Sequence, residues 1–136
     1  MSHKLGIIGY GGMGGWHHSS IVEKVSALDV VAAYDIRPEQ LEAAKKNGLK
    51  AYSTLEAILA DKDIDIVTVA TPNNFHKQLS IAALRAGKNV VCEKPVTMDS
   101  AELEEIIAVS KETGKLFSVH QNRRWDRDYC TVRKAI

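Results

Sequence analysis

Residues 4–14 read KLGIIGYGGMG, an apolar run that passes directly into a turn dense in glycine. Residues 4–8 indicate a buried strand. Gly9, Gly11 and Gly14 follow it with the spacing G-x-G-x-x-G. In a strand–turn–helix unit the first glycine permits the tight turn, the second lets the backbone approach a pyrophosphate, and the third lets helix and strand pack closely. The stretch therefore predicts a turn that binds a dinucleotide at the start of the first helix.

Strand-like and helix-like segments alternate along the rest of the chain, which predicts an α/β fold. Strands are expected at residues 4–8, 29–34, 50–52, 64–70, 89–92 and 116–119, and helices at about 16–28, 38–47, 54–61, 74–86 and 100–113. Ser53 with Glu56 has the spacing of a helix capping box. Asp99 with Glu102 has the same spacing. Right-handed crossovers then predict a doubly wound parallel sheet of about six strands, ordered 3-2-1-4-5-6, with helices on both faces.

The composition is typical of one folded globular domain, with 136 residues, 45% of them apolar and 26% charged. The 18 basic and 17 acidic residues nearly cancel, which argues against binding to nucleic acid or a membrane surface through bulk charge. The apolar runs are far shorter than the roughly 20 residues that span a bilayer. The first residues lack the apolar segment of a secretory leader. With only two cysteines, Cys92 and Cys130, and no disulfide framework, we expect a reducing, cytoplasmic setting.

Asp35 ends the second predicted strand, 21 residues beyond Gly14. A carboxylate at this place accepts hydrogen bonds from the adenosine ribose and repels a 2′-phosphate, so NAD is expected in preference to NADP. Arg37 weakens that preference, because its guanidinium could reach a phosphate or lie against adenine. Two other interpretations stay open. The glycines could form an ordinary turn, or the turn could belong to a methyltransferase that binds S-adenosylmethionine.

Ligands of a doubly wound sheet bind beyond the carboxyl ends of its strands, so the residues that follow each strand are the functional candidates. Thr71-Pro72-Asn73 with His76 follow the fourth strand, Glu93-Lys94-Pro95 follow the fifth, and Asn122-Arg123-Arg124 come after the sixth. Together with the glycine turn and His17, and in this order, these motifs resemble the Gfo/Idh/MocA oxidoreductase family. The resemblance covers essentially the whole chain, and the Glu-Lys-Pro motif is its most specific element.

The resemblance implies an activity and a domain organisation. Family members are NAD(P)-dependent dehydrogenases and reductases that act mostly on sugars, inositols and related cyclic compounds. Residues 1–120 are similar to their dinucleotide-binding Rossmann domain, and residues 121–136 to the junction with a C-terminal domain that binds the small-molecule substrate. We therefore expect a cytoplasmic enzyme that is a homo-oligomer at full length, with the present chain binding the cofactor but turning over poorly or not at all. A stand-alone NAD(P)-binding or regulatory module without catalysis is the alternative.

The resemblance also implies roles for single residues. Lys94 matches the catalytic lysine, which bonds the reacting hydroxyl or carbonyl and assists proton transfer beside the nicotinamide. The residues expected to bind the cofactor are Gly9, Tyr10, Gly11, Gly12, Met13, Gly14, Asp35, Arg37, Thr71, Pro72, Asn73, His76, Glu93, Lys94, Pro95, Asn122 and Arg123. His76 could instead be a histidine of a helix's first turn, and Asn122 with Arg123 could organise the domain junction.

Two further features bear on metals and partners. His17 and His18 are adjacent and point to different faces of a helix, with no cysteine or carboxylate at ligand spacing, so no metal site is expected. An apolar stripe along a terminal helix is predicted from Trp125, Tyr129, Val132 and Ile136. That stripe either docks on the chain's own sheet or leads into a second domain, and it could drive self-association if it stays exposed.

Overall fold

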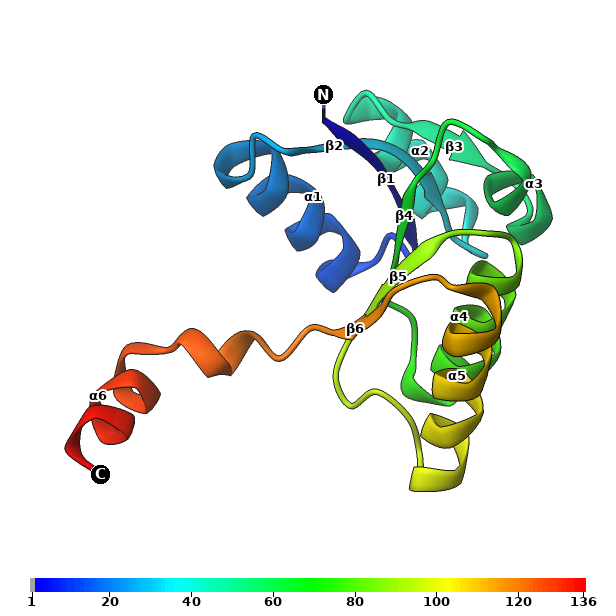
Figure 1. Cartoon of the computed structure of the whole chain (residues 1–136). Coiled ribbons are helices and arrows are strands. Elements are labelled where there is room, and N and C mark those ends of the chain that lie inside the picture. Colours follow the sequence, from blue (N-terminus) through cyan, green and yellow to red (C-terminus); the bar gives the residue numbers. More distant parts are fainter. Residues whose placement is uncertain (1) are drawn as a thin grey trace.

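The structure, a computed structural model, describes residues 2–136 and contains one parallel sheet of six strands (Figure 1). The strands are β1 (His3–Ile8), β2 (Leu28–Tyr34), β3 (Lys50–Tyr52), β4 (Ile66–Val69), β5 (Asn89–Cys92) and β6 (Phe117–Val119). They lie in the order β3-β2-β1-β4-β5-β6, and every neighbouring pair is parallel. The predicted doubly wound Rossmann sheet is confirmed, including its strand order.

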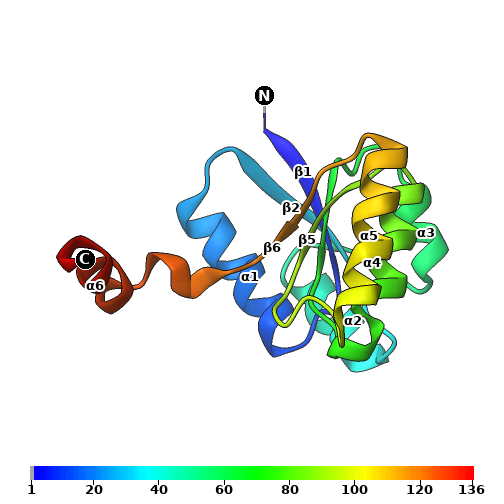
Figure 2. The ribbon, with the colours of Figure 1, turned by 60° about the horizontal axis from the view of Figure 1, so that its bottom comes forward.

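Helices cover both faces of the sheet (Figure 2). They are α1 (Gly12–Lys24), α2 (Pro38–Lys46), α3 (Leu55–Ala60), α4 (His76–Arg85) and α5 (Ser100–Thr113), with the 3-10 turn η1 (Asn73–Phe75) directly before α4. α1 and α2 pack on one face through Ile21 and Ala44. α3, α4 and α5 pack on the other face through Ile58, Leu84 and Ile106. None of the helices described between residues 2 and 136 combines the length and apolar character that crossing a bilayer requires.

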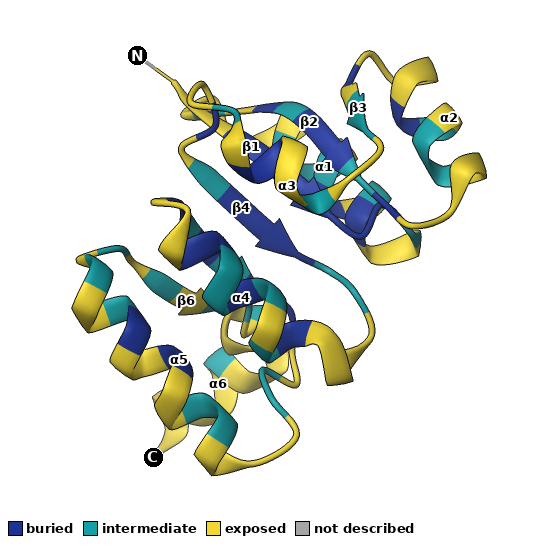
Figure 3. Ribbon diagram, turned by 90° about the vertical axis from the view of Figure 1, so that its right-hand side faces the viewer, coloured by how far each residue is buried: buried dark blue, intermediate teal, exposed yellow. Residues whose placement is uncertain are grey.

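The central strand β1 shows why its sequence is apolar without alternation. Successive side chains of a strand point to opposite faces of the sheet. Ile7 belongs to the cluster beneath α1 and α2, its neighbour Ile8 belongs to the cluster beneath α3, α4 and α5, and both are 0% exposed. In Figure 3 the buried residues accordingly gather on the inner strands and on the inward faces of the helices. A strand with helices packed on both faces of its sheet needs apolar side chains on both faces.

The two edge strands are the shortest of the sheet. β3 and β6 have three residues each, whereas β1 has six and β2 has seven. β3 pairs with residues 32–34 of β2, and β6 pairs with residues 90–92 of β5. The edges are thus paired toward the carboxyl end of the sheet, which is the end where the predicted site residues lie.

The capping-box spacing predicted the N-cap of α5 correctly and that of α3 one residue too early. Asp99 caps α5 as predicted, because its Oδ1 accepts the N–H of Glu102 at 2.9 Å. The predicted cap of α3 at Ser53 is wrong, since Thr54 Oγ1 accepts a backbone N–H of the first turn at 3.2 Å. Glu56 therefore lies at the second helical position instead of the third, where a capping box would need it.

Helix α1 starts and ends four residues earlier than the predicted range 16–28, because it spans residues 12–24. The low helix propensity of glycine favoured a start at Trp16. In the structure Gly14 instead packs closely against Gly9 and Ile7, and both Gly12 and Gly14 lie within the helix. At the other end, Leu28 joins β2. As a result, the N-terminus of α1 lies inside the glycine turn itself.

After β6 the chain leaves the sheet through the 3-10 turn η2 (Asn122–Trp125) to α6 (Arg127–Ala135), and both extend away from the other elements (Figures 1 and 2). The interpretation that this tail docks on its own sheet is wrong, because no residue of α6 is buried. Trp125 lies in η2, so the predicted stripe is divided between two elements. Its members are all exposed, from 48% for Tyr129 to 100% for Ile136.

Candidate functional site

The glycine turn between β1 and α1 packs so tightly that a Cβ at two of its positions would clash with backbone atoms. Gly9 has a φ of 92°, and a Cβ there would lie 2.7 Å from the carbonyl oxygen of Ala70. A Cβ on Gly14 would lie 2.1 Å from the carbonyl oxygen of Gly9. Gly11 differs, since a Cβ there would meet only the Arg37 guanidinium, at 3.1 Å. The first and third glycines therefore permit the turn and the helix packing, while the second leaves backbone accessible to a ligand.

A cavity of about 840 Å³ lies beside this turn, at the carboxyl ends of β1, β2 and β4. Its other walls come from residues 53–56 and from Phe75, Gln78 and Leu79. The volume falls within the range of about 300–1,000 Å³ that is usual for small-molecule and cofactor pockets. The predicted cofactor residues that line it are Gly9, Gly11, Asp35, Arg37, Thr71 and Pro72.

The start of α1 has the chemistry of a phosphate site. The first N–H groups of a helix have no acceptor within the helix. The N-cap of α1 is Gly11, which has no side chain to accept them, and the first turn contains no acidic residue. Free N–H groups at the positive end of a helix dipole attract phosphate groups. Together with the open backbone at Gly11, this end of α1 fits the pyrophosphate of a dinucleotide.

Asp35 reaches the same cavity from the end of β2. Its side chain is 6% exposed and accepts the backbone N–H of Arg37 at 2.9 Å and the guanidinium Nε at 3.2 Å. The Arg37 side chain itself is half-exposed. A ribose hydroxyl could therefore replace the guanidinium as a partner of the carboxylate while the backbone bond keeps the carboxylate in place.

Other predicted cofactor residues lie outside the lining of this cavity. Tyr10 is buried, with its hydroxyl 2.7 Å from His18 Nδ1 and 3.0 Å from Asn47 Nδ2, so its side chain is committed to the protein interior. Arg123 in η2 is 85% exposed and pairs with Asp126 at 2.7 Å. Gly12, Met13, Gly14, Asn73, His76, Glu93, Lys94, Pro95 and Asn122 are likewise outside the lining. A role for these residues in cofactor binding stays a prediction.

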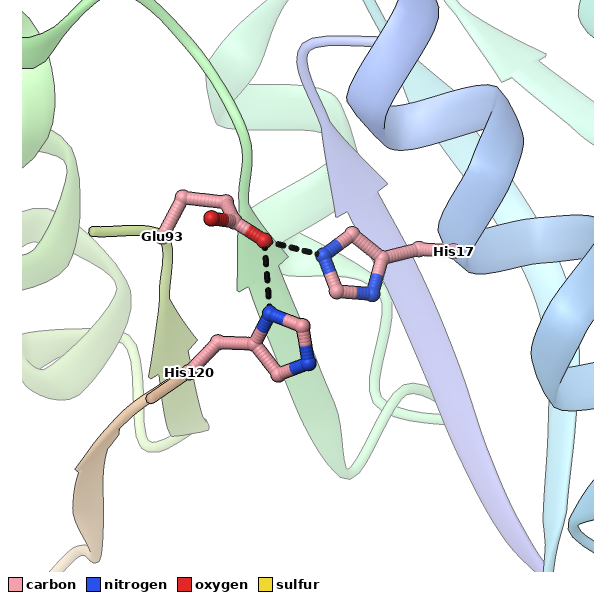
Figure 4. A group of neighbouring side chains, drawn as sticks. All are labelled: His17, Glu93 and His120. Atoms are coloured by element: carbon pink, nitrogen blue, oxygen red, sulfur yellow. Dashed lines mark hydrogen bonds and ion pairs between the residues drawn. The ribbon is translucent and has the colours of Figure 1, made fainter. Parts of the chain in front are cut away.

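The turn after β5 carries the Glu-Lys-Pro motif, and a buried cluster holds its first residue (Figure 4). His17 of α1 places Nε2 2.6 Å from Glu93 Oε1, and His120, which follows β6, places Nδ1 2.8 Å from the same oxygen. Glu93 Oε2 accepts the backbone N–H of Lys94 at 3.1 Å. Glu93 is buried, whereas Lys94 is exposed. The turn thus combines a fully bonded carboxylate with a lysine whose side chain is accessible.

Burial and hydrogen bonding decide the charge of this cluster. Burial raises the pKa of Glu93, but the bonds from His17, His120 and the Lys94 N–H outweigh it and leave that pKa below its ordinary value. Burial lowers the pKa of His17 in spite of its bond to Glu93. The cluster is therefore a carboxylate that accepts from two imidazole rings. In neutral rings these bonds select the Nε2–H tautomer of His17 and the Nδ1–H tautomer of His120.

Two imidazoles and a carboxylate are also a ligand set for metal ions, and the three ligand atoms lie within 4.8 Å of one another. The sequence argument against a metal site overlooked this group, because the His17–Glu93 pair is separated by 76 residues. Two ligands of a tetrahedral zinc ion lie about 3.3 Å apart, given metal–ligand distances of roughly 2.0–2.1 Å. The N···O distances of 2.6 and 2.8 Å are shorter than that. We therefore interpret the group as a hydrogen-bonded cluster.

His76, at the start of α4, is fully buried. Its Nε2 lies 2.9 Å from the carbonyl oxygen of Thr71, and its Nδ1 lies 2.9 Å from the carbonyl oxygen of Pro95. Both partners can only accept, so the imidazole donates, to one of them when neutral and to both when protonated. The ring therefore joins the loop after β4 to the turn after β5. This is the placement of a structural histidine in the first turn of a helix.

His120 also contributes to this edge, although the sequence analysis predicted no role for it beyond its place after a strand. Its only sequence signal is its place directly after the sixth strand, and it shares that signal with every other residue at the carboxyl edge. Its ring bond to Glu93 spans 27 residues, so no local spacing reveals it.

Comparisons with known proteins agree with the fold. Residues 3–121 match the model of a family described as "Oxidoreductase family, NAD-binding Rossmann fold" (GFO_IDH_MocA). The chain is 35% identical over 133 residues to the scyllo-inositol 2-dehydrogenase (NADP(+)) IolW of Bacillus subtilis (strain 168), covering 98% of this chain and 37% of that protein. Among solved structures, it is similar to an NAD-binding protein from Listeria innocua, with 49% identity, a TM-score of 0.94, and coverage of 98% of this chain and 40% of that one.

A second solved structure, the myo-inositol 2-dehydrogenase of Lactobacillus plantarum, is 32% identical with a TM-score of 0.90, again with coverage of 98% of this chain and 40% of that one. The chain therefore spans about two fifths of the length of the relatives it matches, as the 37% and 40% coverage values show.

Proposed function

Because the chain belongs to the Gfo/Idh/MocA oxidoreductase family with an NAD-binding Rossmann fold, we propose that it is the cofactor-binding domain of a dehydrogenase that prefers NAD to NADP. The whole protein would transfer hydride between the nicotinamide and a hydroxyl-bearing carbon of an inositol, a sugar or a related cyclic compound. The observation that carries the proposal is that the open backbone at Gly11 and the carboxylate of Asp35 line one cavity. The substrate class is supported by two relatives named as dehydrogenases of inositols.

The cavity and the start of α1 supply complementary parts of a dinucleotide site. The N–H groups beside Gly11 would bind the pyrophosphate. Asp35 would accept hydrogen bonds from the adenosine ribose. Thr71 and Pro72 line the same cavity, and their loop is joined through His76 to the turn that carries Lys94. The proposed cofactor contacts and the proposed catalytic residue thus belong to connected loops at one edge of the sheet.

Asp35 and Arg37 have opposing effects on the choice of cofactor. The Asp35 carboxylate is 6% exposed, so a 2′-phosphate placed beside it would meet a poorly screened negative charge. Arg37 could attract that phosphate, but its guanidinium already pairs with Asp35. Binding of NADP would require the guanidinium to leave the carboxylate, which would then face the phosphate unpaired. This balance supports NAD, although one relative is named as an NADP(+) enzyme.

Lys94 would carry the proton transfer that accompanies hydride transfer. When bound, NAD supplies the group that takes up or releases the hydride. In the oxidation of an alcohol, the carbinol C–H bond would break with both electrons leaving as hydride for the bound NAD, a C=O double bond would form, and the hydroxyl proton would pass to the Lys94 amine. In the reduction of the ketone, the Lys94 ammonium returns that proton to the carbonyl oxygen. The exposed Lys94 side chain is accessible to a substrate presented from outside this domain.

The remaining parts of the proposal concern the domain organisation and the complete protein. Residues 1–120 would be the cofactor domain and residues 121–136 the junction with a substrate-binding domain, which the extension of η2 and α6 away from the sheet supports. The complete enzyme would be a cytoplasmic homo-oligomer that acts on a small molecule. The alternative, a stand-alone NAD(P)-binding module, predicts cofactor binding without catalysis in the full-length protein.

Calorimetric titration of the chain with NAD and NADP separately tests the proposal. We expect tighter binding of NAD than of NADP, and a loss of about tenfold or more in NAD affinity for Asp35→Ala, since a charged hydrogen bond is removed. Lys94→Ala should retain most of the affinity. Asp63→Ala, which changes an exposed aspartate outside the cavity, is the matched control. Absence of binding to either cofactor, or an unchanged NAD affinity in Asp35→Ala, would refute the proposal.

A further inference from the structure

The turn at residues 93–95 is held by histidines from three separate parts of the chain. His17 of α1 and His120 after β6 bond the residue before Lys94, and His76 of α4 faces the carbonyl of the residue after it. The Lys94 side chain itself stays exposed. We propose that His17 and His120 are positioning residues, which fix the Glu93 carboxylate and through it the backbone from which the Lys94 amine projects.

The geometry at Glu93 carries the first step of this inference. Both imidazoles bond one oxygen, Oε1, and the two rings also lie edge to face, with their centroids 4.6 Å apart (Figure 4). The Glu93 and His17 side chains are 6% and 7% exposed, and the His120 side chain is 26% exposed. A buried carboxylate is tolerated only when hydrogen bonds replace its lost water. The two histidines supply those bonds and leave the carboxylate a single orientation.

The second oxygen of Glu93 connects the oriented carboxylate to the backbone of Lys94. Oε2 accepts the backbone N–H of Lys94 at 3.1 Å. On the other side of the turn, the Pro95 carbonyl lies 2.9 Å from the buried ring of His76. The backbone of Lys94 is therefore anchored both before and after the residue. Loss of either imidazole donor at Glu93 would release one of these two anchors.

The inference rests on the proposed function, because the placement of the turn matters to chemistry only if Lys94 transfers a proton. Such a transfer requires donor and acceptor to lie about 2.6–3.2 Å apart, so a displacement of roughly 1 Å is enough to disrupt it. Helix α1 adds a reason for the coupling. It begins at Gly12, beside the proposed pyrophosphate site, and carries His17 five residues later. One helix therefore contacts both the proposed cofactor site and the Lys94 turn.

Paired variants separate the loss of a hydrogen bond from the loss of a side chain. In His17→Gln a side-chain N–H can replace Nε2–H, and in His120→Asn a side-chain N–H can replace Nδ1–H. His17→Leu and His120→Leu keep apolar bulk and remove the donor. His18→Leu is the matched control, because His18 is the adjacent histidine of α1 and bonds the Tyr10 hydroxyl instead of Glu93.

Hydrogen exchange of the Lys94 amide, followed by NMR in the chain without cofactor, is the primary measurement. We expect exchange on the order of tenfold faster in His17→Leu and His120→Leu, as for the loss of one hydrogen bond to a charged group. The rates in His17→Gln, His120→Asn and His18→Leu should stay close to that of the wild type. If the leucine variants acted only by disturbing the packing, the donor-retaining variants would not restore the wild-type exchange rate of the Lys94 amide.

The outcomes distinguish this inference from the proposed function. An unchanged Lys94 exchange rate in a folded leucine variant would overturn the positioning role, and so would equal acceleration in His18→Leu. If circular dichroism shows that His17→Leu does not fold, the partly exposed His120 pair decides the question by the same criteria. NAD affinity is measured separately by calorimetry. Expected Lys94 responses in a chain that binds no NAD would support the positioning role and refute the proposed function.

Discussion

Replacing Gly14 by alanine is expected to push α1 away from β1. The added Cβ would lie 2.1 Å from the carbonyl oxygen of Gly9 and 3.1 Å from Cγ2 of Ile7. Cβ contacts below 3.0 Å are essentially never found, so the atoms must separate by at least 0.9 Å, the difference between 3.0 and 2.1 Å. The obstructing atom belongs to the backbone of a tight turn and cannot rotate away. The helix itself therefore has to move.

The expected loss of folding free energy in Gly14→Ala can be compared with that in Gly15→Ala, a control one residue further along the same helix. Overpacking a well-packed core costs about 1–3 kcal/mol, and a clash with backbone favours the upper end. Alanine recovers about 1 kcal/mol through its higher helix propensity, so Gly14→Ala should destabilise the fold by about 2 kcal/mol. A Cβ on Gly15 meets nothing within 4 Å. Gly15→Ala should therefore show only the propensity gain, up to about 1 kcal/mol of stabilisation.

Urea denaturation followed by far-ultraviolet circular dichroism measures this difference. With an m-value of about 2 kcal/mol/M, a difference of about 3 kcal/mol separates the two midpoints by about 1.5 M. The wild type should unfold between the two variants. A midpoint for Gly14→Ala that equals or exceeds that of Gly15→Ala would refute the helix–strand contact on which the reasoning depends.

Two further predictions concern thiol reactivity and pH. Burial raises the pKa of Cys92 to about 11, so this thiol should react slowly with a disulfide reagent at pH 8. We expect one fast-reacting thiol per chain, the partly exposed Cys130, and Cys130→Ser should abolish this fast reaction. Two fast thiols in the folded chain would contradict this. Acid should lower the melting temperature in two steps, because the unfolded chain takes up protons before the folded one does. Burial lowers the pKa of His17, which gives a step below about pH 6.5. Burial raises the pKa of Glu93 but its hydrogen bonds outweigh this and lower it, which gives a second step below about pH 4.5. A constant melting temperature from pH 7 to 4 would show that this cluster is not buried as described.

Local sequence signals predicted the sheet because they are the same signals that form it. Unalternating apolar runs such as residues 66–69 are needed wherever both faces of a strand are covered, so the central strands were recognisable. Boundaries were less accessible where tertiary contacts override propensity. Helix α1 begins at Gly12, although glycine has a low helix propensity, and α3 is capped by Thr54, although Ser53 has the capping-box spacing. The position of η2 and α6 depends on whether their apolar residues find a surface to pack against, and the local sequence does not describe that surface.

The candidate site was predictable only as a set of separate motifs. Parallel topology brings the ends of all strands to one edge, so Asp35 and Thr71 were expected near the glycine turn, and they line its cavity. The cluster around Glu93 was not expected. Its partners lie 76 and 27 residues away in the sequence, His17 on α1 and His120 directly after β6, and they meet Glu93 only once these elements have packed against β5. Residue type and spacing contain no record of that packing.

The three-residue strands at both edges of the sheet bear on how copies of this chain would associate. An edge strand presents unpaired N–H and C=O groups that can recruit a strand from another molecule. Here the edges are short, and β3 includes Lys50, whose side chain is 66% exposed and would place a charge in any such junction. The segments richest in β-branched residues lie in the interior strands, where neighbours occupy their hydrogen-bonding groups. Protection against amyloid-like stacking therefore depends on an intact sheet, and partial unfolding that exposes β4 or β1 would be the event that removes it.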